Sequence, residues 1–385
     1  MHAPSRREFI ALLARAGVGA TALASIPPWA RRALAAARPA MGAALIERNA
    51  YPQHLETTLG ALDQGWLTPA NQFFVRSHFQ PPTIDPRTWR LELGGLVHEP
   101  FSLTLAELHA MPTTSVTSVL ECAGNGRGLF RMANTSGTQW ERGAVGNAKW
   151  TGVRLADILR RAKPAAEARH LWFEGADAAP LDTVPKFLRS IPLEKAMHDV
   201  VLAYKMNDSP LPHEHGAPLR SIVLGWYGMA STKWLTRIRA EVDPSDNHFM
   251  AKGYRYVPPG GDPAASPPVE ELRVKSLITH PHEGARVPAG VVLVRGFAWA
   301  GPASVRKVEV SADGGATWRD AAFIGASAPS AWRRFGARLT LARGNATLMA
   351  RASDGAGNVQ PLEAAINTGG YGNNSVHRVH IHVGA

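Results

Sequence analysis

The sequence predicts two domains, an α+β domain followed by an all-β, immunoglobulin-like sandwich. Up to residue 256, strand patterns and short helical patterns alternate irregularly, which is typical of an α+β domain. A segment rich in proline and glycine follows at 257–268 and is expected to be an extended linker. Beyond it, short strand patterns recur at regular spacing, which favours a sandwich of about 115 residues at 269–385.

In the first domain, the expected elements follow one another closely. Residues 36–70 are expected to form a lead-in of helical and loop pieces. Residues 89–93 alternate like a strand and are followed by two glycines. Thr104, with Glu107 three residues later, is expected to cap a short helix. Further strands are expected at 115–120, 170–174 and 219–224, and a helix at 155–161.

The second domain is expected to contain strands alone. Apolar or alternating runs predict strands at 291–297, 305–311, 338–341 and 347–352. Asp313-Gly314-Gly315 and residues 354–358 have the composition of tight turns between them. The domain has no cysteine pair, so a sandwich of the antibody type is excluded.

The N-terminal residues resemble an export signal. Arg6 and Arg7 precede a weakly apolar run at 11–26, and a small-x-small cleavage pattern follows at 33–35. We therefore expect residues 1–35 to be a twin-arginine signal peptide, which would send the folded protein to the periplasm. The apolar run is too short to span a bilayer, and no other stretch reaches that length, so no membrane span is expected.

The chain is basic, with a formal net charge of +11. Removal of residues 1–35 would take away five arginines and one glutamate and leave +7. The remaining basic residues are scattered rather than clustered, which argues against nucleic acid as a partner. An anionic cofactor or substrate explains the excess charge.

Cys122 is the only cysteine, and it lies in a glycine-rich segment, 121–128 (ECAGNGRG). In an exported protein it has no internal disulfide partner. The nearby Arg127 favours the thiolate, and a thiolate on a glycine-rich loop suits a soft metal. A lone cysteine is also often a small buried hydrophobe. From these residues alone, both interpretations stay open.

Several separate motifs, in order, resemble the sulfite oxidase family. They lie at 71–78 (NQFFVRSH), 121–128, 143–150 (GAVGNAKW), 203–207 (AYKMN), 211–216 (LPHEHG), 228–235 (GMASTKWL) and 373–379 (NNSVHRV). The resemblance runs from about residue 67 to the end of the chain. It implies a molybdopterin-binding catalytic domain at 36–256 and a sandwich at 269–385 that forms homodimers.

The resemblance also implies a set of site residues. Cys122 would be the protein ligand to molybdenum. The expected catalytic residues are Arg76, Cys122, Arg127, Tyr254 and Arg333, the last sent from the sandwich in preference to Arg334. The expected contacts to the cofactor are Phe74, His78, Cys122, Asp182, His215, Arg220, Ser231 and Lys233. Arginines suit a doubly charged oxyanion such as sulfite, because their planar donors bind it in bidentate fashion.

The function implied is oxidation of sulfite to sulfate by oxo transfer, with electrons passed singly to a separate cytochrome c or another acceptor. No Cys-x-x-Cys-His motif is present, so no haem is expected in this chain. Reduction of a sulfoxide or another oxyanion is the alternative activity, and a non-catalytic binding protein is the alternative from another class. The chain departs from the family at Gly126, where an arginine is frequent, and at Ala230 and Gly253.

Overall fold

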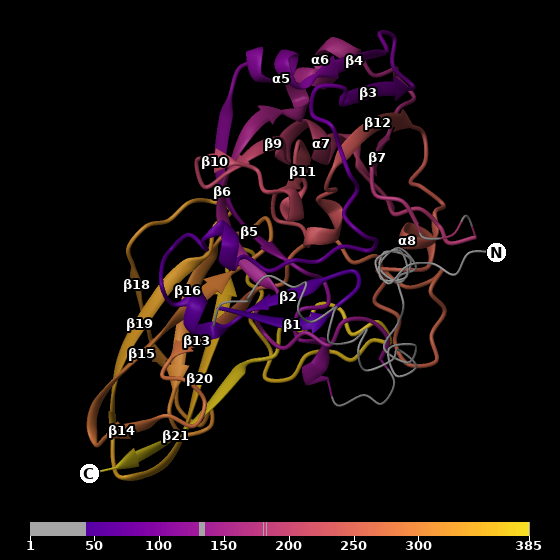
Figure 1. Ribbon diagram of the computed structural model, residues 1–385. Coiled ribbons are helices and arrows are strands. Elements are labelled where there is room, and N and C mark those ends of the chain that lie inside the picture. The colour runs from indigo at the N-terminus through magenta and orange to yellow at the C-terminus, as the bar shows by residue number, and fades with distance from the viewer. Residues whose placement is uncertain (1–43, 131–134, 180, 182, 385) are drawn as a thin grey trace, which may run out of the picture.

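The computed structural model describes residues 44–130, 135–179, 181 and 183–384. The predicted signal peptide and Asp182 lie outside the described residues. None of the helices within them combines the length and apolarity that crossing a bilayer requires. Figure 1 shows a mixed domain above and a sandwich below it, with the C-terminal strand at the far end of the sandwich.

The mixed domain is built on two five-stranded sheets. The first contains β5 (Thr114–Glu121), β6 (Val145–Arg154), β9 (Val200–Met206), β10 (Ser209–Pro210) and β11 (Arg220–Val223). Its order is β10-β9-β6-β5, and β11 also pairs with β9. The second contains β3 (Arg90–Gly95), β4 (Phe101–Thr104), β7 (His170–Gly175), β8 (Leu188–Pro192) and β12 (Leu235–Glu241), in the order β4-β3-β12-β7-β8. The cysteine loop begins where β5 ends.

Three short helices lie against these sheets: α5 (Leu105–Ala110), α6 (Leu155–Ala162) and α7 (Leu193–Asp199). The one-turn helix α8 (His248–Ala251) follows β12. The predicted cap at Thr104 is confirmed, since its hydroxyl accepts from the Glu107 N–H at 3.0 Å and the Glu107 carboxylate accepts from the Thr104 N–H at 2.8 Å. In α6, Leu155, Ile158 and Leu159 enter the main core of the domain, together with leucines of the sheets. An apolar stripe at this spacing is what holds a helix of two turns in place.

The second domain is all-β, as predicted. One sheet has the order β13-β15-β19-β18 and the other the order β14-β21-β20-β16-β17. Their bounds are β13 Lys275–His280, β14 Arg286–Pro288, β15 Gly290–Trp299, β16 Val305–Ser311, β17 Arg319–Asp320, β18 Ala322–Ile324, β19 Arg333–Leu341, β20 Gly344–Asp354 and β21 His377–Gly384. Valines and leucines from both sheets fill the space between them.

The lead-in contains a hairpin that the sequence did not predict. It consists of β1 (Leu45–Asn49) and β2 (His54–Thr57), followed by the one-turn helix α4 (Leu59–Leu62). All four residues of β2 are buried. Glu56 accepts hydrogen bonds from the N–H groups of Arg142 and Gly143 at 2.8 and 2.7 Å. Because buried polar contacts hold β2 to the rest of the protein, its sequence lacks the apolar alternation that identifies a strand.

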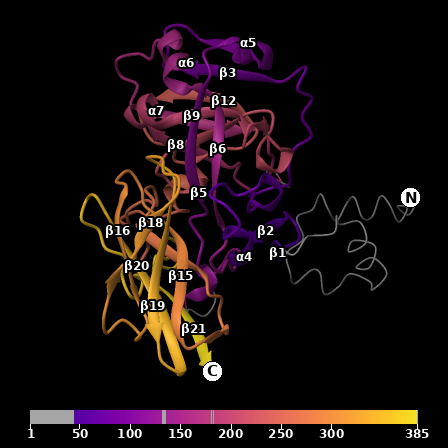
Figure 2. The ribbon, with the colours of Figure 1, turned by 90° about the vertical axis from the view of Figure 1, so that its left-hand side faces the viewer.

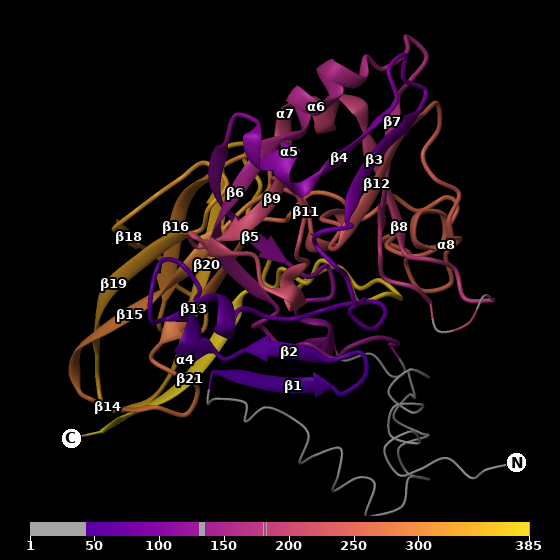
Figure 3. The ribbon, with the colours of Figure 1, turned by 45° about the horizontal axis from the view of Figure 1, so that its top comes forward.

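The two domains share a third core. Residues from both pack together, among them Val119, Tyr227, Phe297, Trp299 and Trp332. The Val119 N–H donates to the Ser330 carbonyl at 2.9 Å. The turned views show β5 reaching down to the sandwich (Figure 2) and the β1–β2 hairpin beside α4 (Figure 3). The end of β5, and with it the cysteine loop, is therefore fixed from both sides.

Candidate active site

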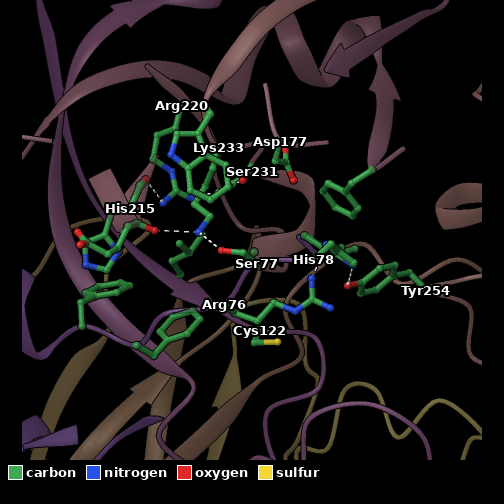
Figure 4. A pocket seen from close by; sticks show the side chains of 18 residues that line it. Arg76, Ser77, His78, Cys122, Asp177, His215, Arg220, Ser231, Lys233 and Tyr254 are labelled. Carbon is green, nitrogen blue, oxygen red and sulfur yellow. Dashed lines mark hydrogen bonds between the residues drawn. The ribbon is translucent and has the colours of Figure 1, made fainter. Parts of the chain in front are cut away.

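A cavity with an empty volume of about 680 Å³, its open mouth included, lies beside the end of β5. Most of the predicted site residues line it: Phe74, Arg76, His78, Cys122, His215, Arg220, Ser231, Lys233 and Tyr254. They come from segments far apart in the sequence, and Figure 4 shows their side chains converging. The size of the cavity suits a small-molecule or cofactor site.

The cysteine loop is held by its backbone. The Cys122 N–H donates to the Ala144 carbonyl at 2.9 Å, and the Asn373 side chain donates to the Gly126 carbonyl at 2.8 Å. Gly126 has φ of +93°, and a Cβ there would lie 2.9 Å from Cβ of Asn373. This close approach explains why a glycine stands where the family often has an arginine. The thiol itself is partly exposed and faces the cavity.

Two cations at one end of the cavity have no carboxylate partner among the described residues. Arg220 donates to the carbonyls of His215 and Ser231 at 2.8 and 3.3 Å, and burial lowers its pKa to about 9. Lys233 donates to the Ser77 hydroxyl at 2.7 Å and the Glu214 carbonyl at 2.8 Å. Burial, followed by the Arg220 charge, lowers the pKa of Lys233. A bound anion would offset both effects, so these residues fit an anionic group.

His215 presents a hydrogen-bond acceptor to the same end of the cavity. Its Nε2 lies 2.9 Å from the Ala70 carbonyl, which only accepts, so Nε2 carries the proton and Nδ1 is free to accept. Burial lowers the pKa of His215 to about 3, which keeps the ring neutral at neutral pH.

At the other end, Arg76, His78 and Tyr254 form a chain beside Cys122 (Figure 4). Arg76 donates to Nδ1 of His78, because a guanidinium has donors only. The neutral ring therefore carries its proton on Nε2, which lies 2.9 Å from the Tyr254 hydroxyl and donates to it. Burial, followed by the Arg76 and Arg189 charges, lowers the pKa of His78. The Tyr254 hydroxyl hydrogen is consequently free to donate into the cavity.

Tyr254 itself is held in an unusual conformation. Its φ is +55°, which lies in a region that residues with a side chain rarely adopt. Its ring stacks on Tyr371 with the centroids 5.1 Å apart. Burial raises the pKa of Tyr254 to about 12, so the hydroxyl stays protonated at neutral pH. Strain of this kind is typical of functional positions.

The structure places Arg127 and Arg333 outside the cavity lining. Arg127 is buried, donates to the carbonyls of Gly369 and Thr138 at 2.9 and 3.1 Å, and lies over the Tyr371 ring. Its space exists because Gly137 lacks a Cβ, which would lie 2.7 Å from the guanidinium. Arg333 lies over the Phe323 ring at 4.1 Å, within the sandwich. In this conformation their charges are used in packing rather than presented to the cavity.

The structure adds residues that sequence reasoning did not single out. Asp177 and Phe187 line the cavity, and Arg189 lies behind Tyr254. A signal for Arg189 exists in the sequence: side chains alternate along β8, so Arg189 shares a face with Ile191, which belongs to the main core. A charged residue at an inward strand position indicates a special environment.

Among the described residues, no three side chains of His, Cys, Asp or Glu gather as a metal site. Besides the Cys122 thiol, the cavity is lined by cations, by neutral polar groups and by the carboxylates of Asp177 and Glu214. A metal held there would take one sulfur from the protein and its remaining ligands from a bound anionic group, which is the arrangement expected for a molybdopterin site.

Two family models match the chain. "Oxidoreductase molybdopterin binding domain" matches residues 78–249, and "Mo-co oxidoreductase dimerisation domain" matches residues 266–384. The crystal structure of the sulfane dehydrogenase SoxCD from Paracoccus pantotrophus is similar, with a TM-score of 0.78 and 28% identity over 96% of this chain and 100% of that chain.

The chain is also similar in sequence to proteins named sulfite oxidase. Mitochondrial sulfite oxidase from Mus musculus is 36% identical over 361 residues, covering 88% of this chain and 66% of that protein. The chain thus spans slightly less than two thirds of the length of this animal relative. Sulfite oxidase from Arabidopsis thaliana is 32% identical over 364 residues, covering 86% of this chain and 92% of that protein. The chain therefore belongs to the sulfite oxidase family of molybdopterin-dependent oxidoreductases.

Proposed function

We propose that this protein oxidises sulfite to sulfate with a molybdenum–molybdopterin cofactor. The observation that carries the proposal is the cation-rich cavity in which a thiol, Arg76 and a Tyr254 hydroxyl donor lie together. Such a cavity suits a small, doubly charged oxyanion held beside a thiolate-bound metal. The relatives that carry the name sulfite oxidase support the same substrate.

The cofactor would be held along the length of the cavity. Cys122 Sγ would bind molybdenum, Arg220 and Lys233 would bind the anionic end of the pterin, and His215, Ser231, His78 and Phe74 would line its path. When bound, the cofactor supplies two-electron redox chemistry and oxygen transfer, which the side chains alone lack.

The side chains beside Cys122 would orient the substrate. Arg76 would offset the charge of the anion, and the Tyr254 hydroxyl would donate to one of its oxygens. The neutral His78 ring would hold that hydroxyl in the donating orientation, since its own Nε2 proton occupies the tyrosine lone pair. The cluster of Phe187 and Phe249 around His78 would keep water from the ring.

Electrons would leave singly to a separate acceptor, for which we propose a soluble cytochrome c, since no haem motif is present in this sequence. The twin-arginine pattern at 1–35 supports export and a periplasmic location. The sandwich would form a homodimer. The exposed apolar residues Val291, Leu293 and Ile324 lie on one sheet and support an interface there.

The proposal is tested on purified protein by metal analysis and by two assays. We expect molybdenum near one atom per chain, and oxidation of sulfite coupled to reduction of cytochrome c. Turnover of a sulfoxide with a reduced dye, without oxidation of sulfite, would favour the reductase alternative. Protein that carries no molybdenum after expression in a molybdopterin-producing host would contradict both activities.

A second candidate is oxidation of a sulfane sulfur. It is favoured by the match to SoxCD, which extends over the whole of that chain. A persulfide tested beside sulfite in the same assay separates the two, because a sulfite oxidase should show the larger kcat/KM with sulfite.

A further inference from the structure

Arg189 is a buried cation without an ion-pair partner among the described residues. The residue is 2% exposed, and it lies in the edge strand β8. One guanidinium nitrogen donates to the Phe249 carbonyl, while Nε has no hydrogen-bond partner. Burying a charge in this way is costly unless another charge offsets it.

The surroundings of Arg189 belong to the substrate end of the cavity. Its guanidinium carbon lies 5.2 Å from the centre of the Tyr254 ring. Phe249, whose carbonyl it binds, packs edge-on against His78 at 4.7 Å. Phe187, two residues before it, stacks on His78 at 3.8 Å and lines the cavity. The charge therefore lies one aromatic layer behind the groups that face the proposed substrate.

One carboxylate acts on Arg189 but does not neutralise it. Glu270 interacts favourably with Arg189 at longer range, without forming an ion pair. Burial, opposed by Tyr254 and Glu270, still lowers the pKa of Arg189 to about 10. The charge lies behind the Tyr254 ring and outside the cavity lining. Among the residues that line the cavity, Arg76 is the cation at this end, and Arg220 and Lys233 lie at the opposite end (Figure 4).

We propose that Arg189 is a specificity-determining residue that supplies the second positive charge for a divalent oxyanion, acting across the Tyr254 ring while Arg76 acts from the cavity wall. This role rests on the proposed function for the identity of the substrate. It assigns to Arg189 the charge that the sequence led us to expect from Arg127 and Arg333, which the structure places in packing contacts. Because no contact with the anion is required, the charge of residue 189 matters more than its donor geometry.

The test compares Arg189→Met and Arg189→Lys in the cofactor-loaded protein. We expect the methionine variant to raise KM for sulfite by roughly tenfold or more, with a smaller change in kcat, and the lysine variant to stay within about threefold of the parent. Ferricyanide serves as acceptor, so that docking of a protein partner does not enter. Arg239→Met is the matched control, because Arg239 also lies over an aromatic ring in the same sheet but is exposed and paired with Glu241.

A second readout does not depend on turnover. Sulfate and nitrate, one divalent and one monovalent, are compared as ligands by the shift each causes in thermal unfolding. The parent should favour sulfate, and Arg189→Met should lose most of that preference while its molybdenum content is unchanged. An unchanged preference in Arg189→Met, or a loss as large in Arg189→Lys, would overturn the proposal, since the latter indicates a purely structural role.

Arg76→Gln keeps the proposal testable if Arg189→Met does not fold. With Arg189 intact, Arg76→Gln should retain part of the preference for sulfate, and complete loss would contradict a second charge. Failure of the proposed function gives a different result: the parent would not oxidise sulfite, yet its preference for sulfate would still depend on Arg189.

Discussion

At the scale of single residues, the chain of Arg76, His78 and Tyr254 decides what the cavity can do. Arginine has no acceptor, so it fixes the tautomer of His78, and that tautomer in turn fixes the direction of the Tyr254 hydroxyl. A tyrosine hydroxyl can accept or donate a hydrogen bond, and without a fixed donor beside it the direction of its hydrogen would not be determined. Here it accepts from the ring and keeps its own hydrogen for the cavity.

Tyr254→Phe should lower kcat/KM for sulfite by about 10- to 100-fold, because one hydrogen bond to the reacting anion is lost. The ring contacts to Tyr371 and Arg189 remain, so the free energy of unfolding should change by only about 1 kcal/mol. Steady-state kinetics and urea unfolding measure the two effects. Since burial raises the pKa of Tyr254 to about 12, the donating form persists up to that pH. If the activity of the parent protein decreases as the pH rises toward 10, the titration of a group other than Tyr254 is therefore responsible.

Cys122→Ser should abolish oxidation of sulfite while the midpoint of thermal unfolding moves by only a few degrees. The loop around residue 122 is held by the backbone and by Asn373, and the thiol forms no hydrogen bond that the fold needs. Molybdenum analysis, sulfite kinetics and circular dichroism provide the measurement. Retained turnover in this variant would remove Cys122 as the metal ligand.

At the scale of elements, the end of β5 is the most constrained part of the site. Glu121, directly before the cysteine, accepts from Lys275 at 2.9 Å, Trp299 at 2.8 Å and Asn125 at 2.9 Å. The first two donors belong to the sandwich, and the Glu121 and Lys275 side chains are 1% and 4% exposed. The sandwich thus fixes the strand that carries the thiol.

Lys275→Met should destabilise the protein by about 3–5 kcal/mol, because it leaves the Glu121 carboxylate buried without its cation. Burial lowers the pKa of Lys275, because the cost of removing its ammonium group from water exceeds the attraction to Glu121. The two side chains therefore stay together through their hydrogen-bond geometry rather than through a large net electrostatic gain. The double variant with Glu121→Gln should recover a substantial part of the loss. Urea unfolding of the three proteins measures the difference; equal stability of the single and double variants would show that the pair does not act as a unit.

Local patterns predicted elements well where one side chain acts on its own neighbourhood. The capping box at Thr104 placed the start of α5, alternation placed β3, and the strands predicted at 115–120 and 170–174 correspond to β5 and β7. Long-range contacts were not predictable in this way. Nothing near Glu56 indicates that it accepts from residues 142 and 143, so the β1–β2 hairpin was missed.

The same difference between local patterns and long-range contacts applies to the site residues. Motif order identified Cys122, Arg76 and Tyr254, which line the cavity. An arginine can direct its guanidinium into the cavity or bind backbone carbonyls with it, and distant glycines decide which occurs. Arg127 binds the Thr138 carbonyl because Gly137 leaves room for its guanidinium. Asp177 was missed because burial, the feature that marks it, is a property of the folded chain. Arg189 was missed because β8 was not predicted as a strand, so the alternation that places Arg189 on an inward face was not applied.

At the scale of the whole molecule, several histidines are buried in neutral form. Burial lowers the pKa of both His54 and His215 to about 3, and it also lowers the pKa of His377. On unfolding, each ring regains an ordinary pKa near 6.5 and takes up a proton below that pH. The unfolded chain then binds more protons than the folded one, so stability falls as pH drops below 6.5 and continues to fall toward pH 3.

For His54 and His215 together, the free energy of unfolding without cofactor should fall by roughly 3–4 kcal/mol between pH 7 and pH 5. Urea unfolding at the two pH values measures it. His54→Gln should reduce the measured difference by about 2 kcal/mol, because one proton fewer is taken up on unfolding. A stability that is equal at both pH values would contradict the burial of these rings as neutral groups.

The Gly126 carbonyl is held by Asn373, a residue synthesised 247 positions later. While a ribosome is still making the sandwich, the loop that carries the thiol lacks this contact and those of Lys275 and Trp299. The loop that carries Cys122 therefore reaches its final shape only when synthesis is nearly complete. Insertion of the proposed cofactor would, on this ground, follow synthesis of the whole polypeptide, in keeping with the proposed export of the folded protein.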